Sequence, residues 1–325
     1  MTGGLRSLPE RRRRSSRPGE LGCPRGRVRA SRARRTIGPV LTERVEVGAG
    51  IELASDRWEP APGAVAGAPF LLVHGLASNA RLWDGTAARL TALGHPVVTV
   101  DLRGHGRSSK PDDGYEVPTV ARDLVEVIDR LGLDRAVVVG QSWGGNVALE
   151  LAVGWPDRIR GIALVDGGWL EPRAVFPDWQ ACLQTLAPPR LVGRPLTEIT
   201  SHLRSSHPDW PETGTRGMLA NFEVRPDGTV APWLTYERHL VVLRGLWDHR
   251  PSERYGAVPV PVLLIPATSS NGVGVERKRH DVEAAAAAIS RSRVRWFVGD
   301  HDIHAQRPDE LGDVLHAAAT DGFFE

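Results

Sequence analysis

Five short apolar runs, each bounded by turn residues, constrain the fold of this chain more than any other feature. They read FLLVHG (70–75), PVVTVD (96–101), AVVVG (136–140), GIALVD (161–166) and VPVLLIP (260–266). Continuous apolar runs of this length are typical of strands that are covered on both faces of a sheet. We therefore expect a central sheet that lies between two layers of other structure.

The segments between these runs have helical periodicity. In residues 117–131, for example, Val120, Leu124 and Val127 fall on one face of a helix. Further helices are predicted at 80–93, 144–154, 281–290 and 308–319. A hairpin is expected over 44–58, and one more strand at 294–298. Strands that alternate with helices predict βαβ units, so the fold class is α/β with a doubly wound, mostly parallel sheet.

The alternation stops over residues 167–255, which show no clear strand and several helical stretches broken by proline. We interpret this block as a helical cap inserted above the carboxyl ends of the strands, where open α/β sheets bind ligands. The α/β core is then expected to comprise residues 37–166 and 256–325. Five of the ten tryptophans lie in the predicted cap, which favours an apolar pocket.

The first 36 residues differ in composition from the rest. They hold 12 Arg and two Glu, a local net charge of +10, so the remainder carries −8 within an overall net charge of +2. With almost no apolar residues and no periodicity, residues 1–36 are predicted to be a disordered tail. We favour a tail without function, from an upstream start codon, over a nucleic-acid-binding arm, because no aromatic residues interleave with the arginines.

Bulk composition excludes several classes of protein. No apolar run reaches the roughly 18–20 residues of a membrane span, so no membrane association is predicted. Cys23 and Cys182 are far apart and show no metal-ligand spacing, which favours a reducing, cytoplasmic setting. No metal, cofactor or nucleic-acid partner is implied. The oligomeric state is left open.

The stretch GQSWG (140–144) contains the candidate catalytic nucleophile. It is a G-x-S-x-G pattern with Ser142 at its centre, between a predicted strand and a predicted helix. In that context the pattern indicates a nucleophile elbow, a sharp turn that exposes one hydroxyl. The alternative is a plain strand-to-helix turn in which Ser142 caps the helix.

Four motifs in this order resemble those of the α/β-hydrolase superfamily over roughly residues 44–320. LVHGLASN (72–79) is similar to the oxyanion loop after that family's third strand, and DLRGHGRSS (101–109) to the loop after its fourth. GQSWGG (140–145) matches the elbow, and GDHDIHAQRPDEL (299–311) resembles the terminal histidine loop. The resemblance implies the α/β-hydrolase fold with a helical cap and a serine nucleophile.

A serine hydroxyl needs a base to become a nucleophile. His301 occupies the position that the resemblance assigns to the base, and we favour it over His304, three residues on, which we interpret as a supporting or pocket residue. His74 and His105 lie in the matched loops and are expected to hold local hydrogen bonds.

The acid of the triad departs from the commonest family pattern, which places Asp soon after the strand at 260–266. Here Ser269, Ser270 and Asn271 follow that strand, and the first carboxylate is Glu276. Some family members carry the acid at the end of the preceding strand, which here is Asp166. We therefore predict the catalytic residues Ser142, Asp166 and His301, with Asp166 accepting a hydrogen bond from the imidazole.

The oxyanion hole is predicted to use the backbone N–H groups of Trp143, directly after the nucleophile, and of Leu76, directly after His-Gly. Their side chains are expected to be free to shape the pocket. No cofactor-binding or metal-binding residue is predicted.

The function predicted on this basis is that of a serine hydrolase. It would cleave an ester-like bond (a carboxylic ester, a lactone or a related acyl compound) of a small, largely apolar molecule through an acyl-enzyme. Dehalogenation and epoxide hydrolysis are disfavoured, because by resemblance those enzymes use Asp where this chain has Ser142. A C–C bond hydrolase, an acyltransferase or a cofactor-free perhydrolase would share these residues. A hydrolase-fold protein that only binds a ligand is the alternative outside enzymes.

Overall fold

The computed structural model describes residues 40–63, 67–268 and 274–325. The predicted tail at 1–36 lies outside the described residues, as do Ser269, Ser270 and Asn271.

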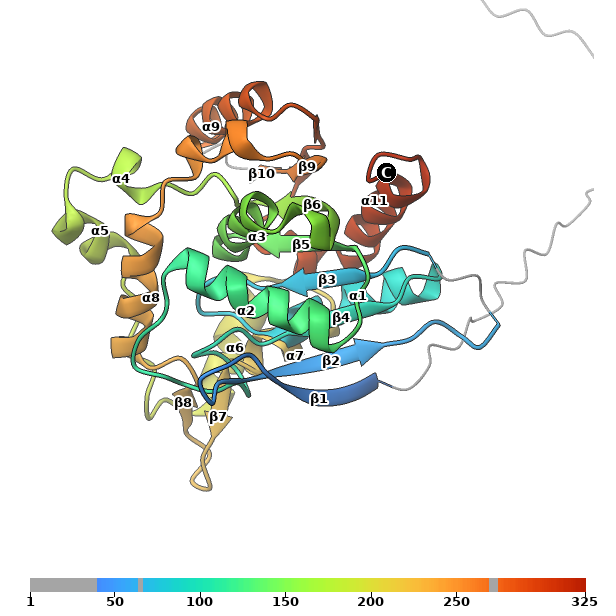
Figure 1. The fold of residues 1–325 in the computed structure, drawn as a ribbon. Helices are drawn as coiled ribbons and strands as arrows, with labels where there is room; N and C mark the ends of the chain where they lie inside the picture. The colour runs from blue at the N-terminus through green and yellow to red at the C-terminus, as the bar shows by residue number, and fades with distance from the viewer. Residues whose placement is uncertain (1–39, 64–66, 269–273) are drawn as a thin grey trace, which may run out of the picture. The chain divides into compact units, whose positions relative to one another are not determined.

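An eight-stranded sheet forms the centre of the fold, with strand order β1-β2-β4-β3-β5-β6-β9-β11 (Figure 1). The bounds are β1 Val40–Glu46, β2 Glu52–Trp58, β3 Phe70–Val73, β4 Val97–Val100, β5 Ala136–Gln141, β6 Ile159–Val165, β9 Val262–Ile265 and β11 Ser292–Val294. Strand β2 pairs antiparallel with both β1 and β4, and the other neighbours pair parallel. The predicted doubly wound, mostly parallel sheet is confirmed.

Helices cover both faces of the sheet, as Figure 1 shows. The core helices are α1 Asp84–Ala92, α2 Val117–Arg130, α3 Trp143–Gly154, α9 Val275–Ala288, α10 Ile303–Gln306 and α11 Pro308–Thr320, with short 3₁₀ turns at Ala80–Trp83 and Pro156–Arg158. Successive residues of each strand point to opposite faces. In β5, Val138 therefore joins the apolar cluster under α2 and α3, whereas Val137 and Val139 join the cluster under α1 and α11. This two-sided burial explains why the strands are apolar without interruption.

The block between β6 and β9 is mostly helical. It contains α4 Pro172–Val175, α5 Trp179–Leu186, α6 Leu196–Ser206, α7 Glu212–Leu219 and α8 Tyr236–Asp248, followed by 3₁₀ turns at Pro251–Glu253 and Tyr255–Ala257. It also contains a small antiparallel hairpin, β7 Phe222–Val224 and β8 Val230–Pro232, where no strand was expected. Three-residue strands are too short for periodicity to reveal. The one sign of the hairpin in the sequence is the Asp227-Gly228 pair between the two strands, which is typical of a tight turn. In the structure Gly228 has φ 79°.

Two segments of the carboxyl-terminal part differ from expectation. The single strand predicted at 294–298 is two strands, because β11 pairs with β9 whereas β12 (Phe297–Val298) pairs with β10 (Ala267–Thr268) in a separate two-stranded sheet. Helix α9 begins at Val275 rather than at residue 281. The earlier start matters for function, because it adds Lys278 to the helix.

Candidate active site

Ser142 lies on a sharp turn between β5 and α3. Its backbone has φ 53° and ψ −123°, a left-handed conformation that is costly for a residue with a side chain. The flanking glycines permit the turn: a Cβ built on Gly140 would lie 2.2 Å from the Gly144 carbonyl oxygen, and one on Gly144 would lie 2.4 Å from the His74 carbonyl oxygen. Ser142 itself is half-buried, so its side chain is not sealed inside the core. The sequence pattern thus corresponds to a strained, accessible turn.

Asp166 lies beside this turn, at the end of the neighbouring strand. Strands β5 and β6 pair in parallel with Gln141 opposite Val165, so the next residue of each strand, Ser142 and Asp166, emerges at the same edge of the sheet. Asp166 is also left-handed, with φ 43°. Gly167 follows it so closely that a Cβ there would lie 2.1 Å from the Ser142 carbonyl oxygen. Two strained residues thus occupy adjacent strand ends.

His301 contacts Asp166 across 135 positions of sequence. Its Nδ1 lies 2.7 Å from Oδ2 of the Asp166 carboxylate. The Asp166 side chain is 2% exposed and the His301 side chain 51%, so the imidazole is accessible while its carboxylate partner is enclosed. The structure therefore brings together the predicted acid and the favoured base.

The charges around His301 move its pKa. Partial burial of the half-exposed imidazole lowers its pKa, but the hydrogen bond with Asp166 and the negative charges of Asp302 and Asp166 outweigh this effect, so the pKa lies above its ordinary value of 6.5. Burial conversely raises the pKa of Asp166, and the contacts with His301 and Lys278 outweigh it, so that pKa lies below its ordinary value. Asp166 is consequently ionised at neutral pH.

Lys278 is a site residue that sequence reasoning missed. Its Nζ lies 2.7 Å from Oδ1 and 2.9 Å from Oδ2 of Asp166, and it also donates to the Ala267 carbonyl oxygen at 2.8 Å. The only signal in the sequence was its rarity, since Lys110 is the other of two lysines in the chain. With the helix predicted to begin at residue 281, nothing placed Lys278 near the acid.

His304, the alternative base, lies in a different environment. Its ring is fully buried and packs on Trp83, with ring centroids 4.4 Å apart. Neither ring nitrogen has a hydrogen-bond partner within the described ranges. Burial, with smaller contributions from His301 and His74, lowers the pKa of His304 to about 3. It is a neutral packing residue and does not bond Asp166.

The predicted oxyanion loop lies against the Ser142 turn. A Cβ built on Gly75 would lie 2.9 Å from the Cβ of Ser142, so a glycine is needed for this approach. His74 fixes the loop from within: Nδ1 donates to the Gly75 carbonyl oxygen at 2.7 Å, and Nε2 accepts from the Leu102 N–H at 2.9 Å. Burial lowers the pKa of His74 and keeps the ring neutral, as this donor–acceptor arrangement requires. His74 thus holds local hydrogen bonds, as expected of it.

Of the two predicted oxyanion donors, Trp143 directly follows Ser142 on the turn, and Leu76 directly follows Gly75 in the loop after β3. Trp143 is the first residue of α3, a position whose N–H has no partner within the helix. The Leu76 N–H donates no hydrogen bond to any other described residue. The expectation that both side chains shape the pocket is wrong for Trp143, which is fully buried and stacks on His105 at 5.6 Å. Packing of α3 against the sheet turns the indole into the core, whereas Leu76 stays half-buried.

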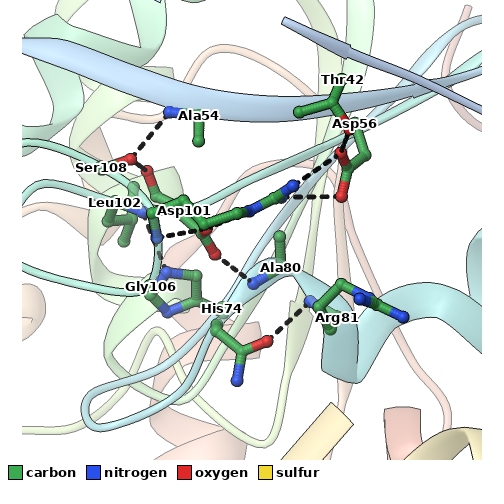
Figure 2. A network of polar contacts seen from close by, with 12 residues as sticks. Thr42, Ala54, Asp56, His74, Ala80, Arg81, Asp101, Leu102, Gly106 and Ser108 are labelled. Carbon is green, nitrogen blue, oxygen red and sulfur yellow. Dashed lines mark hydrogen bonds and ion pairs between the residues drawn. The ribbon is translucent and has the colours of Figure 1, made fainter. Parts of the chain in front are cut away.

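Asp101 organises the loop that follows β4 (Figure 2). Its Oδ1 accepts from the Ala80 N–H at 2.8 Å, and its carbonyl oxygen accepts from the Ser108 hydroxyl at 2.5 Å. Arg107 bridges Asp101 and Asp56, at 3.2 Å and 2.8 Å. The Asp101 side chain thus links the loop at 101–109 to Ala80, which directly follows the predicted oxyanion loop at 72–79.

A cavity of about 600 Å³ opens next to the oxyanion loop. Ala77 and Ser78 line it on the core side, and the segments 188–192 and 231–237 line it on the side of the helical block. Most of the lining residues are apolar. Ala77 directly follows Leu76, whereas Ser142, Trp143 and His301 are not among the residues that line the cavity.

Neither a metal-ligand cluster nor a membrane-spanning helix occurs in the described part of the chain. Residues 40–63, 67–268 and 274–325 contain no group of three or more His, Cys, Asp or Glu arranged to hold a metal ion. Of the helices in these ranges, none is both long enough and apolar enough to span a membrane.

Comparisons with known proteins add family evidence to this geometry. A Caulobacter segnis protein, provisionally named carbamate hydrolase RutD, is 43% identical over 117 residues, which cover 35% of this chain and 42% of that protein. The match thus spans about two fifths of that relative. A 2-(acetamidomethylene)succinate hydrolase of Mesorhizobium japonicum is 28% identical over 232 residues, covering 70% of this chain and 76% of that protein.

Solved structures share the fold. The crystal structure of an E-2-(acetamidomethylene)succinate hydrolase superposes with a TM-score of 0.67 at 21% identity, covering 86% of this chain and 98% of the other. The family described as alpha/beta hydrolase fold matches residues 68–271. The chain therefore belongs to the alpha/beta hydrolase fold family.

Proposed function

We propose that this protein is a serine hydrolase that cleaves an ester-like bond of a small molecule through an acyl-enzyme. The contact between His301 and Asp166 carries the proposal, because an imidazole held by a buried carboxylate is the arrangement that activates a serine hydroxyl, and Ser142 lies at the same edge of the sheet as Asp166. The names of the relatives, which include hydrolases, support the same class of reaction.

The reaction follows from the placement of these groups. Nε2 of His301 takes the Ser142 proton as the serine oxygen forms a bond to the carbonyl carbon, and the carbonyl π electrons move to the oxygen. The N–H groups of Leu76 and Trp143 stabilise that oxyanion. Its collapse breaks the bond to the leaving group, which receives the proton from His301. Water then gives a proton to His301 as its oxygen bonds to the acyl carbon. The bond between that carbon and the Ser142 oxygen breaks, the Ser142 oxygen takes the proton back from His301, and the acid is released.

Most of the lining of the cavity beside the oxyanion loop is apolar, which favours a substrate with an apolar acyl or alcohol group. A second candidate substrate class carries a carboxylate. Arg190 and Arg225 line the cavity, and the Arg190 guanidinium lies 3.9 Å from the centroid of the Tyr236 ring, which also lines it. The succinate in the name of the Mesorhizobium relative is consistent with this second class.

A panel of p-nitrophenyl esters tests the reaction and sorts these classes. It includes neutral acyl chains of two to ten carbons and the monoester of succinic acid. We expect wild-type turnover that Ser142→Ala abolishes. A preference for the succinyl ester that disappears in Arg190→Gln or Arg225→Gln selects the second class, whereas a preference that rises with neutral chain length selects the first. Equal turnover by wild type and Ser142→Ala contradicts the proposal.

A further inference from the structure

All three N–H donors of Lys278 are used in hydrogen bonds, two of them to Asp166, the acid of the proposed triad. An ammonium group has three N–H donors. Those of Lys278 face three acceptors, namely the two carboxylate oxygens of Asp166 and the carbonyl oxygen of Ala267, all within 2.9 Å. No donor is left for a substrate, and an ammonium in this state is not a nucleophile. Any role of Lys278 in the reaction must therefore act through Asp166.

The contacts fix the direction of the carboxylate. Oδ1 of Asp166 accepts from the Ala267 N–H at 2.9 Å and from Lys278 at 2.7 Å. Oδ2 accepts from Lys278 at 2.9 Å and faces Nδ1 of His301 at 2.7 Å. Rotation of the carboxylate about its Cβ–Cγ bond away from this orientation would disturb all four of these contacts. Oδ2 is thus held toward the imidazole.

Charge gives Lys278 a second effect. A carboxylate that is 2% exposed needs a compensating charge. His301 is neutral before it accepts the serine proton, so at that stage Lys278 is the cation in contact with Asp166. Once His301 becomes an imidazolium, Lys278 is a like charge on the same oxygen. Asp166 raises the proton affinity of His301, and the positive charge of Lys278 reduces this effect. Without Lys278, His301 would hold the proton more strongly.

Other charged groups around His301 act in both directions. Asp302 and Asp300 are the carboxyl groups next to His301 in sequence, and burial raises the pKa of Asp302. His304 lies on α10 and is neutral, and His207 of the helical block bonds Asp300 at 3.2 Å. Among the groups that shift His301, Lys278 is the positive one, and it lowers the pKa of the imidazole. Removal of the Lys278 charge should therefore raise the pKa of His301.

We propose that Lys278 is a positioning residue of this active site, which orients the Asp166 carboxylate and limits how tightly the Asp166–His301 pair retains a proton. This inference rests on the proposed serine hydrolase function. It differs from a purely structural role of Lys278, which would support folding without changing the protonation of His301.

The test uses a fluorophosphonate probe, which labels an activated serine without requiring the natural substrate. The rate of labelling of the full chain is measured from pH 5 to pH 9 for wild type, Lys278→Met and Lys278→Arg. Arg277→Met is the matched control: it removes a positive charge from the adjacent position of α9, but Arg277 bonds Asp281 and the Ala174 carbonyl oxygen rather than Asp166. Lys278→Gln replaces Lys278→Met if the latter does not fold.

We expect Lys278→Met to label at least tenfold more slowly at pH 7, with the midpoint of its acid limb about one pH unit higher, because a like charge near the imidazole has been removed. Lys278→Arg keeps the charge and should keep the wild-type midpoint, as should Arg277→Met. Titration of the His301 ring by NMR should show the same shift without any turnover.

The results distinguish a failure of the proposed function from a failure of the inference about Lys278. If wild type does not label at Ser142, the proposed function is wrong. If wild type labels at Ser142 but Lys278→Met retains the wild-type midpoint in both measurements, the inference about Lys278 is wrong, whatever happens to the labelling rate or the thermal stability.

Discussion

The Nδ1 atom of His301 lies 2.7 Å from Oδ2 of Asp166, although the two residues are 135 positions apart and come from a loop and a strand end. The Asp166–His301 pair forms because β6 ends beside β5 and β9, and the loop at 299–302 follows β12 to the same edge. Asp166 thus contacts His301 from the end of β6, whereas the commonest family pattern puts the acid soon after the strand at 260–266.

Asp166→Asn should lower kcat by about 10⁴-fold, because an amide cannot hold the imidazole in the required tautomer or stabilise its charged form. KM should change little, since Asp166 is buried behind His301 and does not reach the substrate. Steady-state kinetics with the preferred p-nitrophenyl ester measure both parameters, and circular dichroism confirms that the variant is folded. A loss of less than tenfold in kcat would assign the acid's role to another residue.

The pH dependence of kcat/KM should report the raised pKa of His301. The imidazole must be neutral to accept the serine proton, so activity is lost as pH falls through this pKa, and the half-maximal point of the acid limb should lie above pH 6.5. Kinetics in buffers of constant ionic strength locate it. An acid limb centred below pH 6 would be inconsistent with a carboxylate-paired His301 acting as the base.

His304→Phe should leave labelling by the fluorophosphonate probe within about tenfold of wild type, since His304 is neutral and packs as an aromatic ring on Trp83. His301→Ala, by contrast, should abolish labelling. The two rates, measured side by side at pH 8, separate the two histidines. The reverse pattern would make His304 the base.

Gly144→Ala should destabilise the protein by about 1–3 kcal/mol and disturb the Ser142 turn, because its Cβ would lie 2.4 Å from the His74 carbonyl oxygen. Gly154→Ala, at the other end of α3, has no atom within 4 Å of the added Cβ and should have normal stability and activity. Urea unfolding and ester turnover test the pair. Equal stability of the two variants would contradict the tight packing described for the turn.

Much of the fold could be predicted because buried parallel strands leave an uninterrupted apolar signal. Ser142 was marked by its flanking glycines, and Asp166 by its place at a strand end. The contacts of Lys278 could not be predicted, since they depend on where α9 begins and on a tertiary arrangement that brings Lys278 to Asp166 at the end of β6. The inward direction of the Trp143 indole likewise depends on packing, and the β7–β8 hairpin is too short for its periodicity to be recognised.

The most direct test of the account is to react the full chain with a fluorophosphonate and to locate the label by peptide mass spectrometry. We expect one label, on Ser142, formed at least a hundredfold more slowly in both His301→Ala and Asp166→Asn. Label on another residue, or labelling of Ser142 at the wild-type rate in Asp166→Asn, would contradict the claim that Asp166 and His301 activate Ser142.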